Sequence, residues 1–415
     1  MKVFKFGGAS VKDTRGVENV AVILQSFDQD PVVVVVSAMG KTTNALESLL
    51  NQFRQGGDYT NELIKIKHFH ASIMQGLFPR GHQVFEQVEN IFGQLLSHLK
   101  MNDPYDHVYD QVVSFGEIIS TVIVEQYLKQ RNMRAQWLDA RDYINTDQTF
   151  REGKVDWVKT RDAIRDLPPL FMKANFVITQ GFIGKTPEGL TTTLGRDGSD
   201  FSAAIFASCL EAESVTIWKD VPGVMNADPK KIPAVTVFPE LPFREAAEMT
   251  YYGASVIHPK TIRPLATHGI PLYVKNFDDP TLPGTKIHEC HIDDLPPLIV
   301  FKENQCLISC KVTDYTFVTE DHLRQIFSIL ADLNVRINVM QNSAISFSFC
   351  FDFRESKLMA VLRKLQPQFE IYYNTGLTLI TVKNYDEKTF NDYRSKPGVL
   401  LEQSSRSTLQ VLLRM

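Results

Sequence analysis

Short apolar runs alternate with amphipathic segments along the first two thirds of the chain. The runs at residues 2–6 and 32–36 are each followed by small or polar residues, and then by apolar positions at helical spacing. Further runs of this kind occur at residues 135–138, 176–179, 215–218 and 272–274. The pattern predicts an α/β fold class, doubly wound around a largely parallel sheet, with ligands at the carboxyl ends of the strands.

Two other stretches interrupt this rhythm. Residues 57 to about 105 contain two polar segments of helical period and no strand pattern, which predicts a helical insertion. Acidic and proline-rich residues at 278–284 and 291–297 are typical of a linker. We therefore expect a first domain over residues 1–285.

The pattern after the linker predicts two small ferredoxin-like units. The expected order of strand, helix, strand, strand, helix and strand is that of the split β-α-β unit, at 305–312, 320–333, 335–340, 345–352, 356–365 and 369–373. We place the first unit at 296–375. A second, truncated unit at 376–415 has strands at 377–382, 399–402 and 409–412 and lacks its last helix and strand.

Composition narrows the classes of function. The chain has 415 residues, with 44 Lys and Arg against 48 Asp and Glu, so no basic surface for nucleic acid or an anionic membrane is expected. No apolar run near the N-terminus approaches the roughly 18 residues of a membrane span, and no signal-peptide pattern precedes the first strand, so a cytoplasmic location is expected. The five cysteines form no Cys-x-x-Cys pair, which predicts neither a disulfide framework nor a zinc site.

Residues 5–10, Lys-Phe-Gly-Gly-Ala-Ser, lie between the first strand and the first helix. Paired glycines let backbone N–H groups approach phosphate oxygens, and a lysine beside them can neutralise charge on a phosphoryl group. The same residues also suit a plain tight turn. Local chemistry alone leaves both readings open.

Residues 191–200 form a second segment of this kind, leading into another helix. Arg196 offers a bidentate contact to a carboxylate, Ser199 is the expected N-cap, and Asp200 would complement the helix dipole. A well-capped turn is the alternative. Glu117, at the start of an apolar helix, is either a ligand or an ordinary first-turn carboxylate.

Taken in order, the motifs of the chain resemble those of the aspartate kinases. They occur at residues 5–11, 36–40, 43–44, 114–117, 181–182, 193–200, 219–224, 227–230, 246–249, 252–254 and 256–259. An ordered set of this length does not arise by chance. The C-terminal part resembles the ACT domains that this family carries as regulatory units.

The resemblance implies ATP- and Mg²⁺-dependent phosphorylation of the side-chain carboxylate of L-aspartate, a step that leads to lysine, threonine and methionine. It also implies a homodimer joined through the ACT domains. Such a nucleophile is ionised at pH 7 and needs no general base, so catalysis reduces to alignment and charge neutralisation. The absence of a catalytic triad agrees with this chemistry.

The resemblance also assigns site residues. Lys5 and Asp200 would be catalytic. The aspartate pocket would contain Ser37, Thr43, Glu117, Arg196 and Ser199, with Glu117 facing the ammonium and Arg196 a carboxylate. Contacts to ATP would come from Lys5, Gly7, Gly8, Ser10, Lys219, Asp220, Met225, Lys230, Ser255, Val256 and Lys260. No metal held by the protein alone is implied.

Some positions depart from the family pattern. Ser255 stands where a lysine is common, with Lys260 as a possible substitute, and Met225 stands where an aromatic residue often meets the nucleotide. In the second part, Asn338 replaces an effector-binding aspartate, and the segment 318–322 is acidic where relatives inhibited by lysine have a glycine-centred turn. Weak or absent inhibition by lysine is therefore expected.

Two other functions are compatible with parts of the sequence. The first is another amino acid kinase, acting on a different carboxylate or on a phosphorylated acceptor. The second is an amino-acid sensor without turnover. Glu117 and Arg196 together with the ACT units argue against the first, and a retained phosphoryl-stabilising Lys5 argues against the second.

Overall fold

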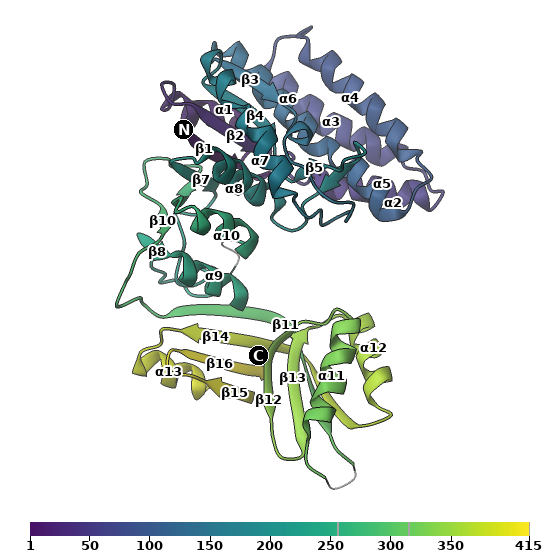
Figure 1. Ribbon diagram of the computed structural model, residues 1–415, viewed down its shortest axis with the longest axis vertical. Coiled ribbons are helices and arrows are strands. Elements are labelled where there is room, and N and C mark those ends of the chain that lie inside the picture. Colours follow the sequence, from purple (N-terminus) through teal and green to yellow (C-terminus); the bar gives the residue numbers. More distant parts are fainter. Residues whose placement is uncertain (255–256, 314–315, 415) are drawn as a thin grey trace. The chain divides into compact units, whose positions relative to one another are not determined.

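The computed structural model describes residues 1–254, 257–313 and 316–414 (Figure 1). The chain divides into two compact units. The first contains residues 1–224, 237–247 and 257–291, and the second contains residues 225–236, those from 248 to 254, and 292–414. The predicted domain boundaries stay predictions.

The first unit is built on an eight-stranded sheet in the order β3-β4-β2-β1-β7-β9-β10-β8. Neighbouring strands are parallel except for the antiparallel pair β9 and β10. The strands are β1 (Lys2–Phe6), β2 (Val32–Val36), β3 (Ala135–Leu138), β4 (Phe176–Gln180), β7 (Ser214–Lys219), β8 (Glu240–Pro242), β9 (Leu272–Asn276) and β10 (Thr285–His288). The predicted fold class, with a mostly parallel sheet, is confirmed.

All six strands predicted for this part are present, and the central strands β2 and β4 are buried along their whole length. Every residue of Val32–Val36 is fully buried, as expected for a central strand of a parallel sheet. The short strands β8 and β10 were not predicted, nor was the hairpin of β5 (Ile183–Lys185) and β6 (Thr191–Thr193). Strands of three or four residues are too short to show a period.

Helices cover both faces of this sheet. On one face, α1 (Thr14–Gln25) and α6 (Phe115–Gln130) share a core with Phe4, Phe6 and alternate valines of β2. On the other, α8 (Gly198–Leu210) packs on β1, β2 and β7, and α10 (Pro259–Thr267) packs on α8. The remaining helices outside the insertion are α7 (Trp157–Arg165), α9 (Phe243–Tyr252) and the 3₁₀ turns Ala140–Asp142 and Pro168–Met172.

Residues 42–113 are helical. They form α2 (Thr42–Arg54), α3 (Thr60–Leu77), α4 (Val84–Leu99) and α5 (Tyr105–Val113), and no strand falls within this described range. Their apolar faces join the core that contains α1 and α6. The region therefore extends one face of the first unit instead of forming a core of its own.

The second unit contains a six-stranded antiparallel sheet in the order β12-β13-β11-β14-β16-β15. Its strands are β11 (Leu298–Lys311), β12 (Ile337–Asn342), β13 (Ser346–Asp352), β14 (Glu370–Lys383), β15 (Val399–Ser404) and β16 (Thr408–Arg414). Its helices are α11 (Glu320–Asp332), α12 (Glu355–Leu365) and α13 (Glu387–Arg394). Strands from both of the predicted small units thus form one sheet.

Two strand assignments in this part were wrong. No strand ends between residues 373 and 377. β14 continues through Gly376, which adopts φ +67. Likewise, β11 begins at Leu298 instead of residue 305. Its pairing register with β14 shifts around Asn304, at φ +55, and the strand continues past this irregularity. Asn304 and Gly376, both with a left-handed backbone, lie inside continuous strands, whereas the sequence pattern begins or ends a strand beside each of them.

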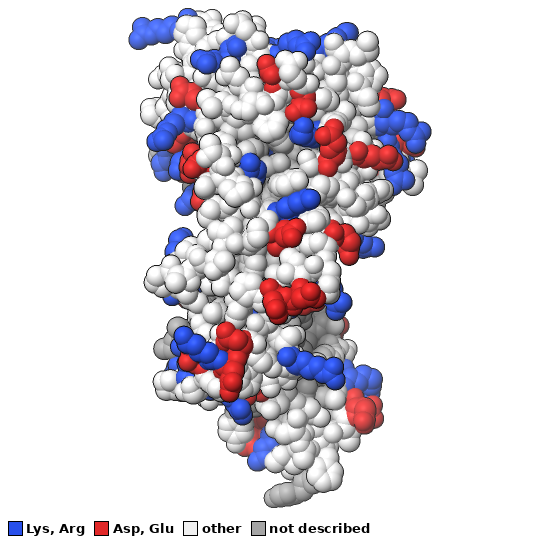
Figure 2. Space-filling view, turned by 90° about the vertical axis from the view of Figure 1, so that its left-hand side faces the viewer, with Lys and Arg blue, Asp and Glu red and all other residues white. Residues whose placement is uncertain are grey.

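Charged side chains of both signs are mixed on the face that Figure 2 shows. Figure 2 shows lysine and arginine side chains interspersed with acidic ones instead of gathered into a basic patch. In the ranges that the structure describes, no helix is both long and apolar enough to cross a membrane.

Candidate active site

A cavity of about 470 Å³ lies at the carboxyl ends of β1 and β2 in the first unit. Its wall takes residues from the turns that follow these two strands, from α6 and from the start of α8. This is the edge of the sheet at which a doubly wound fold binds its ligands. The predicted location of the site agrees with the position of this cavity.

A buried ion cluster adjoins this cavity, and two of its three residues, Lys5 and Asp200, line the wall. Lys5 Nζ lies 2.6 Å from Asp200 Oδ1, and Lys219 Nζ lies 3.8 Å from Asp200 Oδ2. Burial by itself would raise the pKa of Asp200, but the charges of Lys5 and Lys219 outweigh it, and the pKa is lowered. One ionised carboxylate therefore faces two lysines. An excess of positive charge at this point favours an anionic ligand such as a phosphoryl group.

Close backbone packing fixes the turn after β1. A Cβ on Gly8 would lie 2.5 Å from the carbonyl oxygen of Ala38 and 2.9 Å from that of Gly40, so only glycine fits here. The Gly40 N–H also donates to the Gly8 carbonyl at 2.9 Å. This contact holds the turns after β1 and β2 together, so that Lys5 and Ser37 line one cavity.

Glu117 lies in the first turn of α6, almost fully buried, on the wall of the same cavity. The Ala38 N–H donates to its Oε1 at 3.3 Å, while its buried Oε2 has no hydrogen-bond partner among the described residues. Burial raises the pKa of Glu117 to about 8. A buried acceptor without a donor indicates that a ligand supplies the missing hydrogen bond.

Arg196 lines the cavity from its exposed rim. Its side chain is 81% exposed, and its guanidinium lies 3.8 Å from the neighbouring Asp197 carboxylate. The flanking residues Gly195 and Asp197 have φ values of +75 and +54. This left-handed backbone turns the chain sharply into α8 and leaves the long side chain able to reach a ligand.

The predicted N-cap was wrong. α8 begins at Gly198 and its N-cap is Asp197, which makes no side-chain capping hydrogen bond. Ser199 instead lies in the first turn and packs against the end of β4, since a Cβ on Gly181 would lie 2.5 Å from the Ser199 Cβ. The positive φ at Asp197 starts the helix two residues earlier than the capping preference of serine predicts.

One cavity brings together most of the residues assigned to catalysis and to the acceptor. Its lining includes Lys5, Gly8, Ser37, Thr43, Glu117, Arg196, Ser199 and Asp200. Gly7 is adjacent, because a Cβ there would lie 3.4 Å from Lys5 Nζ. The structure thus groups the two proposed catalytic residues with all five proposed substrate-binding residues.

The residues assigned to the nucleotide are spread more widely. Ser10 and Asp220 line a second cavity of about 380 Å³ beside α1. Lys260 forms an ion pair with Glu152. Met225 and Lys230 belong to the second unit. Ser255 and Val256 lie outside the described residues.

Sequence reasoning missed Tyr109, Phe182 and Arg151, which also line the first cavity. The Arg151 guanidinium stacks 4.0 Å from the centroid of the Tyr109 ring and lies 3.1 Å from the Glu47 carboxylate. Arg151 has φ +65, which an arginine rarely adopts. No motif surrounds it, so nothing in the sequence could have indicated its place at the site.

Comparisons with known proteins agree with this architecture. The model of the amino acid kinase family matches residues 1–276. Lysine-sensitive aspartokinase 3 of Escherichia coli is 32% identical over 399 residues, covering 92% of this chain and 87% of the relative. A bifunctional aspartokinase/homoserine dehydrogenase 2 of Arabidopsis thaliana is 30% identical, but the chain spans only 42% of its length.

Solved structures show the same fold. The crystal structure of E. coli aspartokinase III in complex with aspartate and ADP superposes with a TM-score of 0.84 at 29% identity, covering 100% of this chain and 96% of that one. Clostridium acetobutylicum aspartate kinase gives a TM-score of 0.80 at 21% identity, with the same coverage of 100% and 96%. The chain therefore belongs to the amino acid kinase family and, within it, to the aspartokinases.

Proposed function

We propose that this protein is an aspartate kinase, which transfers the γ-phosphoryl group of ATP to the side-chain carboxylate of L-aspartate and forms 4-phospho-L-aspartate. The observation that carries the proposal is the first cavity. Its wall combines the ion pair of Lys5 and Asp200 with the carboxylate of Glu117 and the guanidinium of Arg196. A relative of 29% identity and matching fold was solved with aspartate and ADP, which supports this assignment.

The acceptor end of the cavity suits a zwitterion with a second carboxylate. The unpartnered Oε2 of Glu117 would accept a hydrogen bond from the substrate ammonium, and Arg196 would pair with the α-carboxylate. The hydroxyls of Ser37, Thr43 and Ser199 would complete the pocket. These contacts would leave the side-chain carboxylate free to face Lys5.

Charge neutralisation is the chemistry that this cluster can supply. Lys5 would stabilise negative charge on the transferring phosphoryl group, and Asp200 would hold the ammonium of Lys5 in place through their 2.6 Å contact. Lys219 adds a second positive charge, and its pKa is lowered, chiefly by burial, which the Asp200 charge opposes. Because the acceptor carboxylate is ionised at neutral pH, no residue of the chain needs to remove a proton.

Binding of ATP with Mg²⁺ fits the residues present. The narrow turn at Gly8 leaves backbone groups beside Lys5, as a phosphate site requires. Asp200 is committed to two lysines, so we infer that Mg²⁺ is held mainly by the phosphate oxygens, whose charge it would neutralise. Contacts from Gly7, Ser10, Asp220, Met225, Lys230, Ser255, Val256 and Lys260 stay predictions.

We also propose a homodimer joined through the second unit, which forms the ACT units of this protein. Large apolar side chains are exposed on the surface of this unit, and a second copy of the chain would cover them. They are Phe317, Met340, Ile345, Tyr372 and Tyr373, which are 46% to 71% exposed. The product would enter the biosynthesis of lysine, threonine and methionine.

Inhibition by lysine is proposed to be weak, although a relative is named as lysine-sensitive. Thr319 and His322 already cap the start of α11, and Glu320 and Asp321 would repel an effector carboxylate there. Asn338 donates to Asp352 at 2.9 Å and accepts from Lys302 at 2.7 Å, so it is engaged within the unit and carries no charge for an effector ammonium.

The activity can be tested by trapping the acyl phosphate. With ATP, Mg²⁺ and hydroxylamine, we expect L-aspartate to give a hydroxamate. L-Glutamate should give far less, because its longer side chain would shift the carboxylate relative to Lys5 when Glu117 and Arg196 hold the α-groups. A clear hydroxamate signal with another carboxylate and none with aspartate would overturn the assignment.

The pH dependence tests the role of Glu117. Its folded-state pKa of about 8 means that the carboxylate is largely protonated below that pH and ionised above it. We therefore expect kcat/KM for aspartate to rise with pH up to about 8, because only the ionised form pairs with the substrate ammonium. Glu117→Gln should raise KM and remove this rise.

Arg196→Ala is the matched control for that experiment. It should raise KM roughly tenfold to a hundredfold, as loss of a charged hydrogen bond costs about 1.5–3 kcal/mol, and leave the pH profile unchanged. A profile that still rises in the Glu117→Gln variant would show that another group titrates.

The assembly and its regulation are tested together. Light scattering should give twice the chain mass of 47.1 kDa, and lysine added to the aspartate assay should leave the rate nearly unchanged. A monomeric mass would contradict the proposed dimer. Strong inhibition by lysine at concentrations near KM for aspartate would contradict the reading of Glu320, Asp321 and Asn338.

A further inference from the structure

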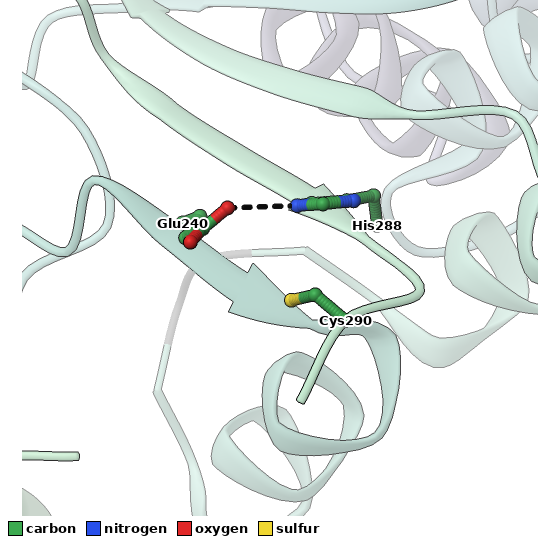
Figure 3. A group of neighbouring side chains, drawn as sticks. All are labelled: Glu240, His288 and Cys290. Carbon is green, nitrogen blue, oxygen red and sulfur yellow. Dashed lines mark hydrogen bonds and ion pairs between the residues drawn. The ribbon is translucent and has the colours of Figure 1, made fainter. Parts of the chain in front are cut away.

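Three potential metal ligands converge at one edge of the large sheet, in the first unit. Figure 3 shows Glu240 on β8, His288 at the end of β10 and Cys290 just beyond it, with their side chains directed toward a common space. Glu240 Oε2 lies 3.0 Å from His288 Nε2, and the ligand atoms of all three residues lie within 4.8 Å of one another. None of the three lines either of the two cavities described above.

The backbone accounts for this convergence. β8 and β10 are parallel neighbours, with Lys286 opposite Glu240 and His288 opposite Pro242. Because side chains alternate along a strand, His288 points to the same side of the sheet as Glu240. Cys290 follows His288 by two residues and returns to that side, as Figure 3 shows. The arrangement is set by strand pairing and not by a chance meeting of long side chains.

We propose that Glu240, His288 and Cys290 bind a divalent transition-metal ion, with Zn²⁺ the best chemical match, in a site whose fourth position is taken by water. Thiolate, imidazole and carboxylate are the three protein ligands that zinc uses. Zinc ligands at about 2.0–2.3 Å from the ion lie roughly 3.5 Å apart, so shifts of about 1 Å would close the site. Mg²⁺, which prefers six oxygen ligands, does not suit this donor set.

The surrounding charges support a cation here. The carboxylates of Glu240 and Glu289 lie close enough to Cys290 to act on it electrostatically, and Lys286 is the opposing positive charge among the groups that do so. Without a cation, the thiolate would add negative charge to an already acidic neighbourhood. The His288 side chain is 22% exposed and that of Glu240 51%, so an ion can reach the site from solvent.

No sequence pattern indicates this site. The expectation of no zinc centre rested on the missing Cys-x-x-Cys pair. The proposed site instead uses the single cysteine Cys290, with His288 two residues before it and Glu240 a further 48 residues before His288. Only the pairing of β8 with β10 brings the three together. Both strands are among those that the sequence did not predict.

Cobalt provides a spectroscopic test on the full chain. Titration with Co²⁺, in the presence of excess Mg²⁺, should produce a thiolate-to-metal absorption band that saturates at about one ion per chain and is removed by Zn²⁺. Cys290→Ser should abolish that band. His288→Ala and Glu240→Gln should weaken Co²⁺ binding at least about tenfold, since each removes a ligand.

Cys209→Ser is the matched control, because Cys209 is also partly exposed but belongs to no such cluster among the described residues. It should keep the band. Zn²⁺ should also raise the melting temperature of the unmodified chain and of this control, but not of the Cys290→Ser variant. Circular dichroism checks that each variant is folded.

Two results would overturn the proposal: Co²⁺ bound without a thiolate band, or a band that persists in Cys290→Ser. Neither measurement depends on turnover. Failure of the metal site therefore leaves the proposed kinase activity untouched, and failure of the kinase assignment leaves the metal site untouched.

Discussion

The site depends on the burial of the Asp200 carboxylate between two lysines. Asp200 is close to fully buried, and an isolated carboxylate there would be expected to take up a proton. Lys5 and Lys219 prevent this, and both come from the ends of adjacent parallel strands, since Phe6 on β1 lies opposite Trp218 on β7. The parallel sheet therefore creates the charge cluster, and the first turn of α8 supplies the carboxylate at its centre.

The acceptor half of the cavity follows from a different constraint, which is close packing of two backbone turns. Only glycine fits at position 8, because the carbonyls of Ala38 and Gly40 fill the space where a side chain would begin. The Ala38 N–H that this packing positions is the one that donates to Glu117. The close packing at Gly8 and the hydrogen bond to Glu117 thus involve the same turn, which links the proposed phosphate turn to the proposed amino acid pocket.

The sequence predicted those features that depend on buried periodicity or on local motifs. Val32–Val36 and its neighbouring strands could be read directly, since a strand buried on both faces is an uninterrupted apolar run. Lys5, Glu117 and Arg196 were assigned through the ordered motifs that resemble the aspartate kinases. The structure brings all three to one cavity, and their roles stay predictions. The features that escaped prediction depend on backbone geometry or on pairing between distant segments. Arg151 and Asp197 adopt positive φ without being glycine, and β8 pairs with β10 only in the folded chain.

A double-mutant cycle on Lys5 and Asp200, read out as kcat for phosphorylation of aspartate, tests this account most directly. Each single variant, Lys5→Ala and Asp200→Ala, should lower kcat by roughly 10²- to 10³-fold, as for loss of a positioned electrostatic contact. If Asp200 acts by positioning Lys5, the kcat of the double variant should be only slightly lower than that of Lys5→Ala alone. Circular dichroism should confirm that all three variants are folded. Losses that multiply in the double variant would show that the two residues act independently and would contradict the account.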